Sequence, residues 1–120
     1  MRGPGARTKT LALPWSVPYL LQKPARKQPR ALVVLLHRYG GDPGHFARSI
    51  PRLGLSDCAF LVPRGPFRVM AGKGEIGFAW AVSTPQEQDP EGRDFSRAFV
   101  QRLTRRILRE LRPLHPAAIA

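Results

Sequence analysis

Residues 31–42 read ALVVLLHRYGGD, an unbroken apolar run that leads into a glycine-containing turn. The run from Ala31 to Leu36 is apolar at odd and even positions alike, which is typical of a strand buried on both faces in a parallel or mixed sheet. In the turn from His37 to Asp42, glycine lets the chain bend so that backbone N–H groups can be directed at an anion. This stretch therefore predicts a central strand followed by an anion-binding loop.

The segments around this stretch predict alternating strands and helices. Asp42 and Pro43 indicate a helix start, because aspartate caps the first turn and proline fits the first helical position. That helix would be short, since Pro51 limits it. A second buried strand is predicted over 59–62. Two short N-terminal strands, 8–13 and 17–22, are predicted to form a hairpin or meander, and a loop is predicted over 23–30.

The longest helix is predicted over 94–112, after a loop over 83–92. Its apolar side chains recur with a period of 3.6 residues along one arc, at Phe99, Val100, Leu103, Ile107 and Leu111. The opposite arc carries Arg102, Arg105, Arg106, Arg109 and Arg112. Such a helix covers a sheet and exposes arginine to water. The repeated order of strand, loop and helix indicates α/β architecture with parallel crossovers.

The composition favours one globular domain with a strongly basic surface. The chain has 120 residues, of which 42% are apolar, and a net charge of +12. Sixteen of the 20 basic residues are arginine, but they are spread along the sequence and aromatic residues do not interleave with them. This distribution disfavours a dedicated nucleic-acid-binding surface, although non-specific adhesion to polyanions is expected.

The cysteine, histidine and hydropathy patterns exclude several other classes of protein. The single Cys58 cannot form an internal disulfide, and its apolar neighbours indicate a buried thiol. No apolar run reaches the length of a membrane span, and Pro14 interrupts the N-terminal apolar patch, so a secretory signal is not predicted. We expect a cytoplasmic protein with no membrane contact. Neither metal-ligand spacing nor a nucleotide-binding motif is present, so no cofactor is predicted.

Three short motifs occur in a specific order along the chain. The apolar strand ends in HRYGGD at 37–42, the next strand leads into PRGP at 63–66, and GFAW follows at 77–80. In this order they resemble the α/β-hydrolase fold, and within it the carboxylesterase and phospholipase-like group of small serine esterases. The resemblance covers about residues 8–112. It implies a mixed, mostly parallel sheet with flanking helices.

The resemblance also implies roles for individual residues. The backbone N–H of Tyr39 would be the first donor of an oxyanion hole, which stabilises the negative carbonyl oxygen formed during acyl transfer. His37 would brace the loop through hydrogen bonds and would not act as the catalytic base. The substrate-binding region of an ester hydrolase would comprise His37, Gly40, Gly41, Phe67 and Trp80. Phe67 and Trp80 are also compatible with a purely structural role in the core.

The sequence departs from the family pattern in two respects. Arg38 stands where the family usually has glycine, so the turn could hold the oxyanion donor out of alignment. No Gly-x-Ser-x-Gly motif occurs, because none of the five serines has the flanking glycines of a nucleophile turn. His45 and His115 are poor candidates for a catalytic base, since in this family the catalytic histidine follows the nucleophile along the chain.

We therefore expect the N-terminal half of a small serine esterase domain over residues 8–112, truncated before the nucleophile turn and inactive alone. Residues 1–7 would form a basic tail and residues 113–120 a C-terminal tail. An ester would be the substrate of the parent enzyme. Two alternatives remain: a non-catalytic assembly module that self-associates through an exposed strand edge, and a basic nucleic-acid-binding protein.

Overall fold

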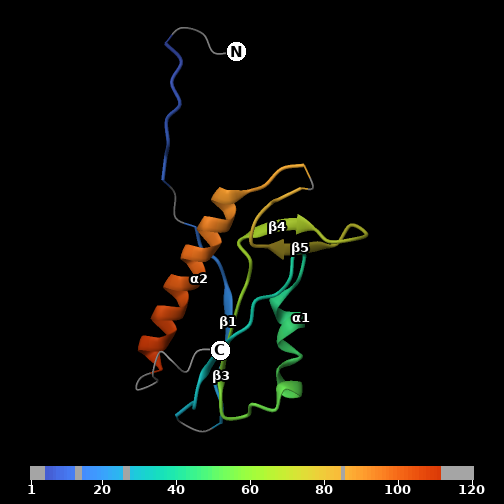
Figure 1. Cartoon of the computed structure of the whole chain (residues 1–120), viewed down its shortest axis with the longest axis vertical. Helices are drawn as coiled ribbons and strands as arrows, with labels where there is room; N and C mark the ends of the chain where they lie inside the picture. The colour runs from blue at the N-terminus through green and yellow to red at the C-terminus, as the bar shows by residue number, and fades with distance from the viewer. Residues whose placement is uncertain (1–4, 13–14, 26–27, 85, 112–120) are drawn as a thin grey trace.

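The computed structural model describes residues 5–12, 15–25, 28–84 and 86–111, which form two small sheets, a short helix and a long helix (Figure 1). In the first sheet the strand order is β1-β3-β2, with β1 at Tyr19–Gln22, β2 at Leu32–Val34 and β3 at Ala59–Pro63. The second sheet is a hairpin of β4 (Phe67–Met70) and β5 (Ile76–Ala79). The protein is thus mixed α/β.

The expectation of a mostly parallel sheet is wrong. Strand β2 pairs with β3 in parallel, but β1 pairs with β3 antiparallel, and the β4–β5 pair is antiparallel as well. The hairpin arises because only a short glycine-rich segment separates β4 from β5, and a short connection joins antiparallel neighbours. Two of the three strand pairs in the described part of the chain are therefore antiparallel.

Strand β3 is the centre of the molecule, and all five of its residues are buried. Its alternate side chains face opposite sides of the sheet. Ala59 and Leu61 pack with Ile107 on one side, whereas Phe60 and Val62 pack with Ile50 on the other. The predicted buried strand over 59–62 is confirmed, and it has a hydrophobic cluster on each face.

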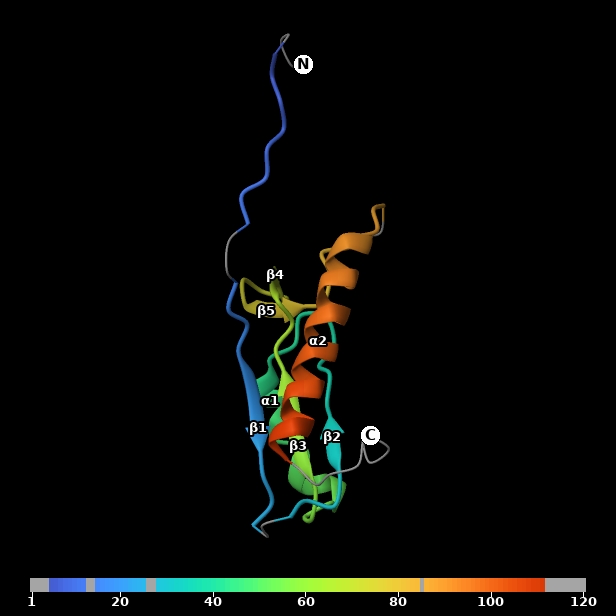
Figure 2. The ribbon, with the colours of Figure 1, turned by 90° about the vertical axis from the view of Figure 1, so that its left-hand side faces the viewer.

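Helices cover both faces of the first sheet. Helix α1 (Pro43–Ala47) and the 3-10 helix η1 (Ile50–Leu53) lie on one side, and α2 (Pro90–Glu110) lies on the other, in front of the sheet in Figure 2. The predicted cap of α1 is confirmed, since the Asp42 carboxylate accepts a hydrogen bond of 2.8 Å from the Gly44 N–H. Of the predicted apolar arc of α2, Phe99, Leu103, Ile107 and Leu111 pack in the cluster on the sheet.

Helix α2 begins four residues before the predicted start. Asp89 accepts a hydrogen bond of 3.0 Å from the Gly92 N–H, and Pro90 occupies the first turn. This is the same aspartate–proline start that α1 has. The prediction missed it because apolar periodicity begins only later in the helix.

Several predicted strands are shorter than expected or do not form. Residues 8–12 form no strand and are exposed, and no described strand lies beside them to pair with their backbone. Strand β2 ends at Val34, and Leu36 is 52% exposed. The predicted loop over 23–30 is confirmed at its described positions. Residues 1–4 of the predicted basic tail, Leu13, and residues 112–120 at the predicted helix end and C-terminal tail lie outside the described residues.

Among the described residues, no helix has the length and apolarity needed to cross a lipid bilayer.

Candidate functional site

The loop that follows β2 is held against the β4–β5 hairpin. The Gly40 N–H donates to the Phe78 carbonyl at 2.8 Å, and the Phe78 N–H donates to the Gly41 carbonyl at 3.0 Å. Gly40 has a φ of +77°, and a Cβ on Gly77 would overlap the Gly40 carbonyl. Glycine is required at both positions, because the loop adopts a left-handed conformation at one and touches the hairpin backbone at the other.

His37 is buried at the base of this loop and uses both ring nitrogens. Its Nδ1 lies 2.8 Å from the Arg38 carbonyl oxygen, and its Nε2 lies 2.9 Å from the backbone nitrogen of Gly65. A neutral ring with its proton on Nδ1 satisfies both contacts, because Nδ1 then donates and Nε2 accepts. His37 therefore joins the loop to the PRGP segment.

Trp80 continues the same hydrogen-bond network toward α2. Its indole N–H donates to the His37 carbonyl at 2.8 Å, and its ring packs on the His37 ring with centroids 5.0 Å apart. The Ser96 hydroxyl donates to the Trp80 carbonyl at 2.6 Å. The three motifs quoted from the sequence thus meet around one buried histidine, and a helix residue completes the network.

Sequence reasoning missed Ser96, which was considered only as a nucleophile. Ser96 is buried on the sheet-facing side of α2. Its spacing to Phe99 and Leu103 is that of the apolar arc, so a polar residue there signals a buried hydrogen bond. That signal was present in the sequence, but it identified no partner.

A hollow of about 1170 Å³ opens beside the loop. The loop supplies one wall, α1 supplies His45 and Phe46, and the hairpin turn supplies a third side. The lining residues are Leu36, His37, Arg38, Tyr39, Gly40, Gly41, Asp42, His45, Phe46, Met70, Ala71, Gly72, Glu75 and Ile76. The loop residues that sequence reasoning selected therefore border one open depression.

The backbone N–H groups of the loop differ in their hydrogen bonds. Gly40 donates to Phe78, and Gly41 donates to the Arg38 carbonyl at 2.9 Å. Within the part of the chain that the structure describes, the N–H groups of Arg38 and Tyr39 have no hydrogen-bond acceptor. Arg38 and Tyr39 both line the hollow, and neither backbone N–H is bonded within the loop.

The backbone at Arg38 does not need the conformation that only glycine adopts easily. No described residue other than glycine has a positive φ, and the left-handed position in this loop is Gly40. The side chain of Arg38 is exposed and borders the hollow together with Asp42, His45 and Glu75. The expected strain from a side chain at position 38 is therefore absent.

Phe67 lies outside the hollow. It packs edge-on against Trp15, with ring centroids 5.6 Å apart, and lies 6.2 Å from the Phe95 ring. This aromatic cluster is between the N-terminal segment, β4 and α2. His37, Tyr39, Gly40 and Gly41 thus line the hollow, whereas Trp80 contacts His37 without lining it and Phe67 lies elsewhere.

Other chemistry-bearing residues are dispersed. Cys58 is buried in the core, where its thiol lies 3.6 Å from an Asp57 oxygen. No group of three or more potential ligands that could hold a metal ion occurs among the described residues. His115 lies outside the described residues.

A scan against models of protein families finds no match for this chain, and a search of curated proteins finds none.

Proposed function

We propose that residues 37–42 form the oxyanion-stabilising loop of a carboxylic ester hydrolase of the α/β-hydrolase type, with the Tyr39 N–H as the first donor. The observation that carries this proposal is the arrangement around His37. Its hydrogen bonds fix the loop against the other two motifs, while the Tyr39 N–H remains free at the hollow.

The chemistry needs this kind of donor. When a nucleophile attacks an ester carbonyl, the π electron pair moves to oxygen, which becomes negatively charged. A backbone N–H that is already oriented stabilises this charge without reorganising during the reaction, and losing one such donor costs about 100-fold in rate. The neutral His37 ring contributes by positioning, since both of its nitrogens are occupied.

The topology independently supports a site at this loop. The β2–α1–β3 connection passes over one face of the sheet, whereas α2 covers the other. Right-handed crossovers that pass over opposite faces of a sheet move the chain in opposite directions across the sheet. The crossover through α1 moves the chain from β2 to β3, so a crossover through α2 would move it back past β2. It would place a further parallel strand at the free edge of β2. The carboxyl end of β2 would then be the point where strand order reverses, which is where such sheets bind ligands.

The 120 residues contain no nucleophile turn, so the proposal assigns this chain the electrostatic part of the reaction. None of its five serines has the Gly-x-Ser-x-Gly context. Ser96 is committed to the Trp80 carbonyl and Ser49 to the Phe46 carbonyl. A nucleophile would have to come from outside these residues. We therefore expect a fluorophosphonate probe to leave the purified chain unlabelled, and stoichiometric labelling would contradict this assignment.

A titration with methylphosphonate, a tetrahedral oxyanion, tests the loop directly. We expect the largest amide shift in ¹H–¹⁵N spectra at Tyr39, with smaller shifts at Gly40 and Gly41, whose N–H groups are already bonded. Tyr39→Pro removes this N–H and should weaken binding at least about tenfold, because a hydrogen bond to a charged group contributes about 1.5 to 3 kcal/mol.

Tyr39→Ala is the matched control, because it removes the side chain and keeps the N–H. It should bind methylphosphonate as the unchanged chain does. The indole signal of Trp80 and the amide of Gly65 report whether the proline variant keeps its fold. Equal binding by both variants, or shifts confined to arginine side chains, would refute the proposed loop.

A further inference from the structure

Strand β1 has an open edge on the side away from β3. The Arg64 N–H donates to the Pro18 carbonyl, so the antiparallel register places the hydrogen-bonding groups of Leu20 and Gln22 toward β3. The N–H and C=O groups of Tyr19 and Leu21 consequently point outward. No strand pairs with this edge in the described part of the molecule. An edge of this kind is a template for another extended chain.

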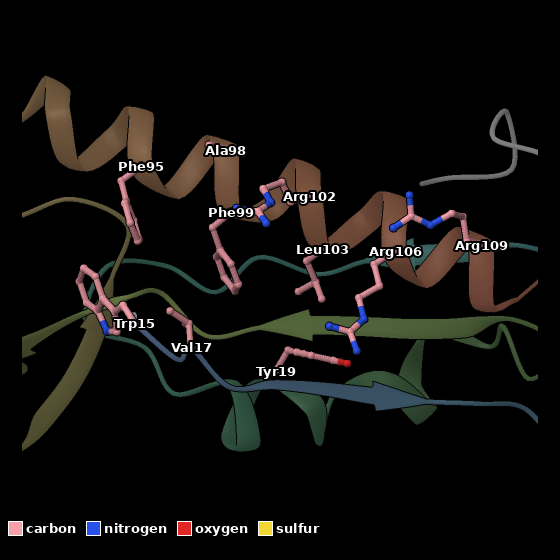
Figure 3. Close-up of a pocket in the computed structure, with 10 residues that line it drawn as sticks. All are labelled: Trp15, Val17, Tyr19, Phe95, Ala98, Phe99, Arg102, Leu103, Arg106 and Arg109. Carbon is pink, nitrogen blue, oxygen red and sulfur yellow. The ribbon is translucent and has the colours of Figure 1, made fainter. Parts of the chain in front are cut away.

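A groove of about 890 Å³ runs along this edge, between β1 and α2 (Figure 3). Trp15, Tyr19 and Phe99 give it an apolar surface, and we call it the arginine groove because the helix side is lined by Arg102, Arg106 and Arg109. Figure 3 shows the Arg106 side chain extending from the helix toward Tyr19 on β1. A chain added to β1 would therefore lie within reach of Arg106.

The arginine spacing matches an extended acidic chain. Positions 102, 106 and 109 are separated by a rise of about 6 Å and then about 4.5 Å along the helix. Alternate side chains of a strand are about 6.7 Å apart and point to the same face. Flexible arginine side chains can adjust to the difference between the helix spacing and the strand spacing. Carboxylates at alternate positions of a strand on β1 would thus face the arginine row.

The arginines lack enough acidic partners of their own. Among the described residues, Arg102 and Arg109 form no salt bridge, and Arg106 pairs only with Glu110, at 3.4 Å. From these observations we propose that the arginine groove binds an extended acidic segment of another protein, which adds a strand to β1 and places alternate carboxylates against Arg102, Arg106 and Arg109.

Charge selects this occupant over other segments of the same chain. A second copy carries a net charge of +12 and, paired through β1, would bring its own arginine row close. The N-terminal segment carries Arg7 and Lys9 and no acidic residue. The alternating acids at 87, 89 and 91 surround the start of α2, where Asp89 caps the helix.

The open backbone edge selects a peptide over a nucleic-acid strand. Single-stranded nucleic acid would stack its bases on free aromatic faces. Here the Trp15 ring is already stacked on Phe95, with centroids 4.9 Å apart, and Phe67 meets it edge-on. The outward N–H and C=O groups of Tyr19 and Leu21, by contrast, match the alternating donors and acceptors of an extended peptide backbone.

Fluorescence anisotropy with a labelled peptide tests the proposal. The probe is a nine-residue peptide with glutamate at alternate positions and valine between them. A peptide of the same composition with its glutamates in one block, and a single-stranded oligonucleotide, are the comparison ligands. We expect the alternating peptide to bind about tenfold more tightly than the block peptide, because only its carboxylates share one face.

Variants of α2 locate the contact. Arg102→Glu and Arg109→Glu should each weaken binding of the alternating peptide about tenfold, because each removes a cation from the groove and adds a repelling anion. Arg105→Glu is the matched control: it changes the charge identically on an exposed part of the same helix that does not line the groove. It should change the affinity less than about threefold, because exposed charges away from the contact are screened.

N-methylation of the peptide separates strand addition from simple charge attraction. Methyl groups on the amides of one edge should abolish binding, and methyl groups on the other edge should not, because one edge alone pairs with β1. Equal loss from Arg105→Glu, equal affinity for the block peptide, preference for the oligonucleotide, or no binding of the alternating peptide would each overturn the proposal.

Discussion

At the scale of the residue, His37 shows how a titratable side chain can serve structure. The residue is 4% exposed, its ring bridges the Arg38 carbonyl and the Gly65 N–H, and its own carbonyl accepts from Trp80. A general base needs a nitrogen free for the substrate proton. Neither nitrogen of His37 is free, so the residue's contribution to the loop is its geometry.

Replacing His37 should destabilise the fold. His37→Phe retains a ring that can pack on Trp80 but leaves the Gly65 N–H without an acceptor and the Arg38 carbonyl with the Gly41 N–H as its remaining donor. We expect a loss of about 1 to 3 kcal/mol in the free energy of unfolding, measured by urea denaturation. His45→Phe, at an exposed position, should change it by about 0.5 kcal/mol or less. Equal effects of the two substitutions would contradict the bracing role.

Gly77 should tolerate no side chain, although its φ is ordinary. A Cβ there would overlap the Gly40 carbonyl, so Gly77→Ala should separate the hairpin from the loop. We expect large shifts of the Gly40 and Gly41 amides in ¹H–¹⁵N spectra and reduced stability. Gly44→Ala is the control, because its Cβ would meet only the Asp42 carboxylate, at 3.4 Å. Unchanged loop amides in Gly77→Ala would show that the close approach is not needed.

At the scale of the element, a single aspartate connects the start of α2 to the loop before it. The Val82 N–H donates to Asp89 at 2.8 Å, and the Gly92 N–H donates to the other carboxylate oxygen. The hydrogen bond from Val82, followed by that from Gly92, holds the pKa of Asp89 below its ordinary value near 3.8. The folded state therefore favours the ionised carboxylate.

This pKa shift predicts a specific loss of stability in acid. The contribution of Asp89 is fully present above its unfolded pKa and disappears as the pH falls from about 3.8 through the lower folded value. Measured from pH 6 down to about pH 2.5, the free energy of unfolding should fall more steeply for the unchanged chain than for Asp89→Asn, which can cap without titrating. Parallel pH profiles would contradict the role of this carboxylate.

The elements also show what the sequence could and could not predict. Periodicity identified α2, and apolar runs identified β2 and β3, because the apolar side chains that bury these segments belong to the segments themselves. Aspartate followed by proline marked the start of α1, whereas the same pair at Asp89 and Pro90 was not used to predict the start of α2. The β4–β5 hairpin was missed because each strand has four residues and half-exposed side chains. Its pairing depends on the loop that it packs against.

The candidate site was predictable in part. The motif resemblance indicated a bracing histidine, and His37 does contact both of the other motifs. The contribution of Ser96 and the separate location of Phe67 depend on how α2 and the N-terminal segment pack, which no local pattern specifies. The concern about Arg38 was resolved only by the backbone angles, because the left-handed position is two residues further along.

At the scale of the whole molecule, the described strands leave both edges of the first sheet without a partner. The central sheet has three strands, with β1 and β2 at its two edges. Helices cover both faces, so the uncovered hydrogen-bonding groups are concentrated at these edges. Association through either edge would bury groups that water now solvates.

Hydrogen exchange should distinguish the two sides of each edge strand. In β1 the Leu20 and Gln22 amides should be protected and the Tyr19 and Leu21 amides should exchange rapidly. In β2 the Leu35 amide, bonded to the Leu61 carbonyl, should exchange more slowly than that of Val34, which points outward. A dilution series is the control: protection of outward amides that disappears on dilution would reveal self-association through that edge. Protection that persists at every concentration would contradict the open edges on which strand addition to β1 depends.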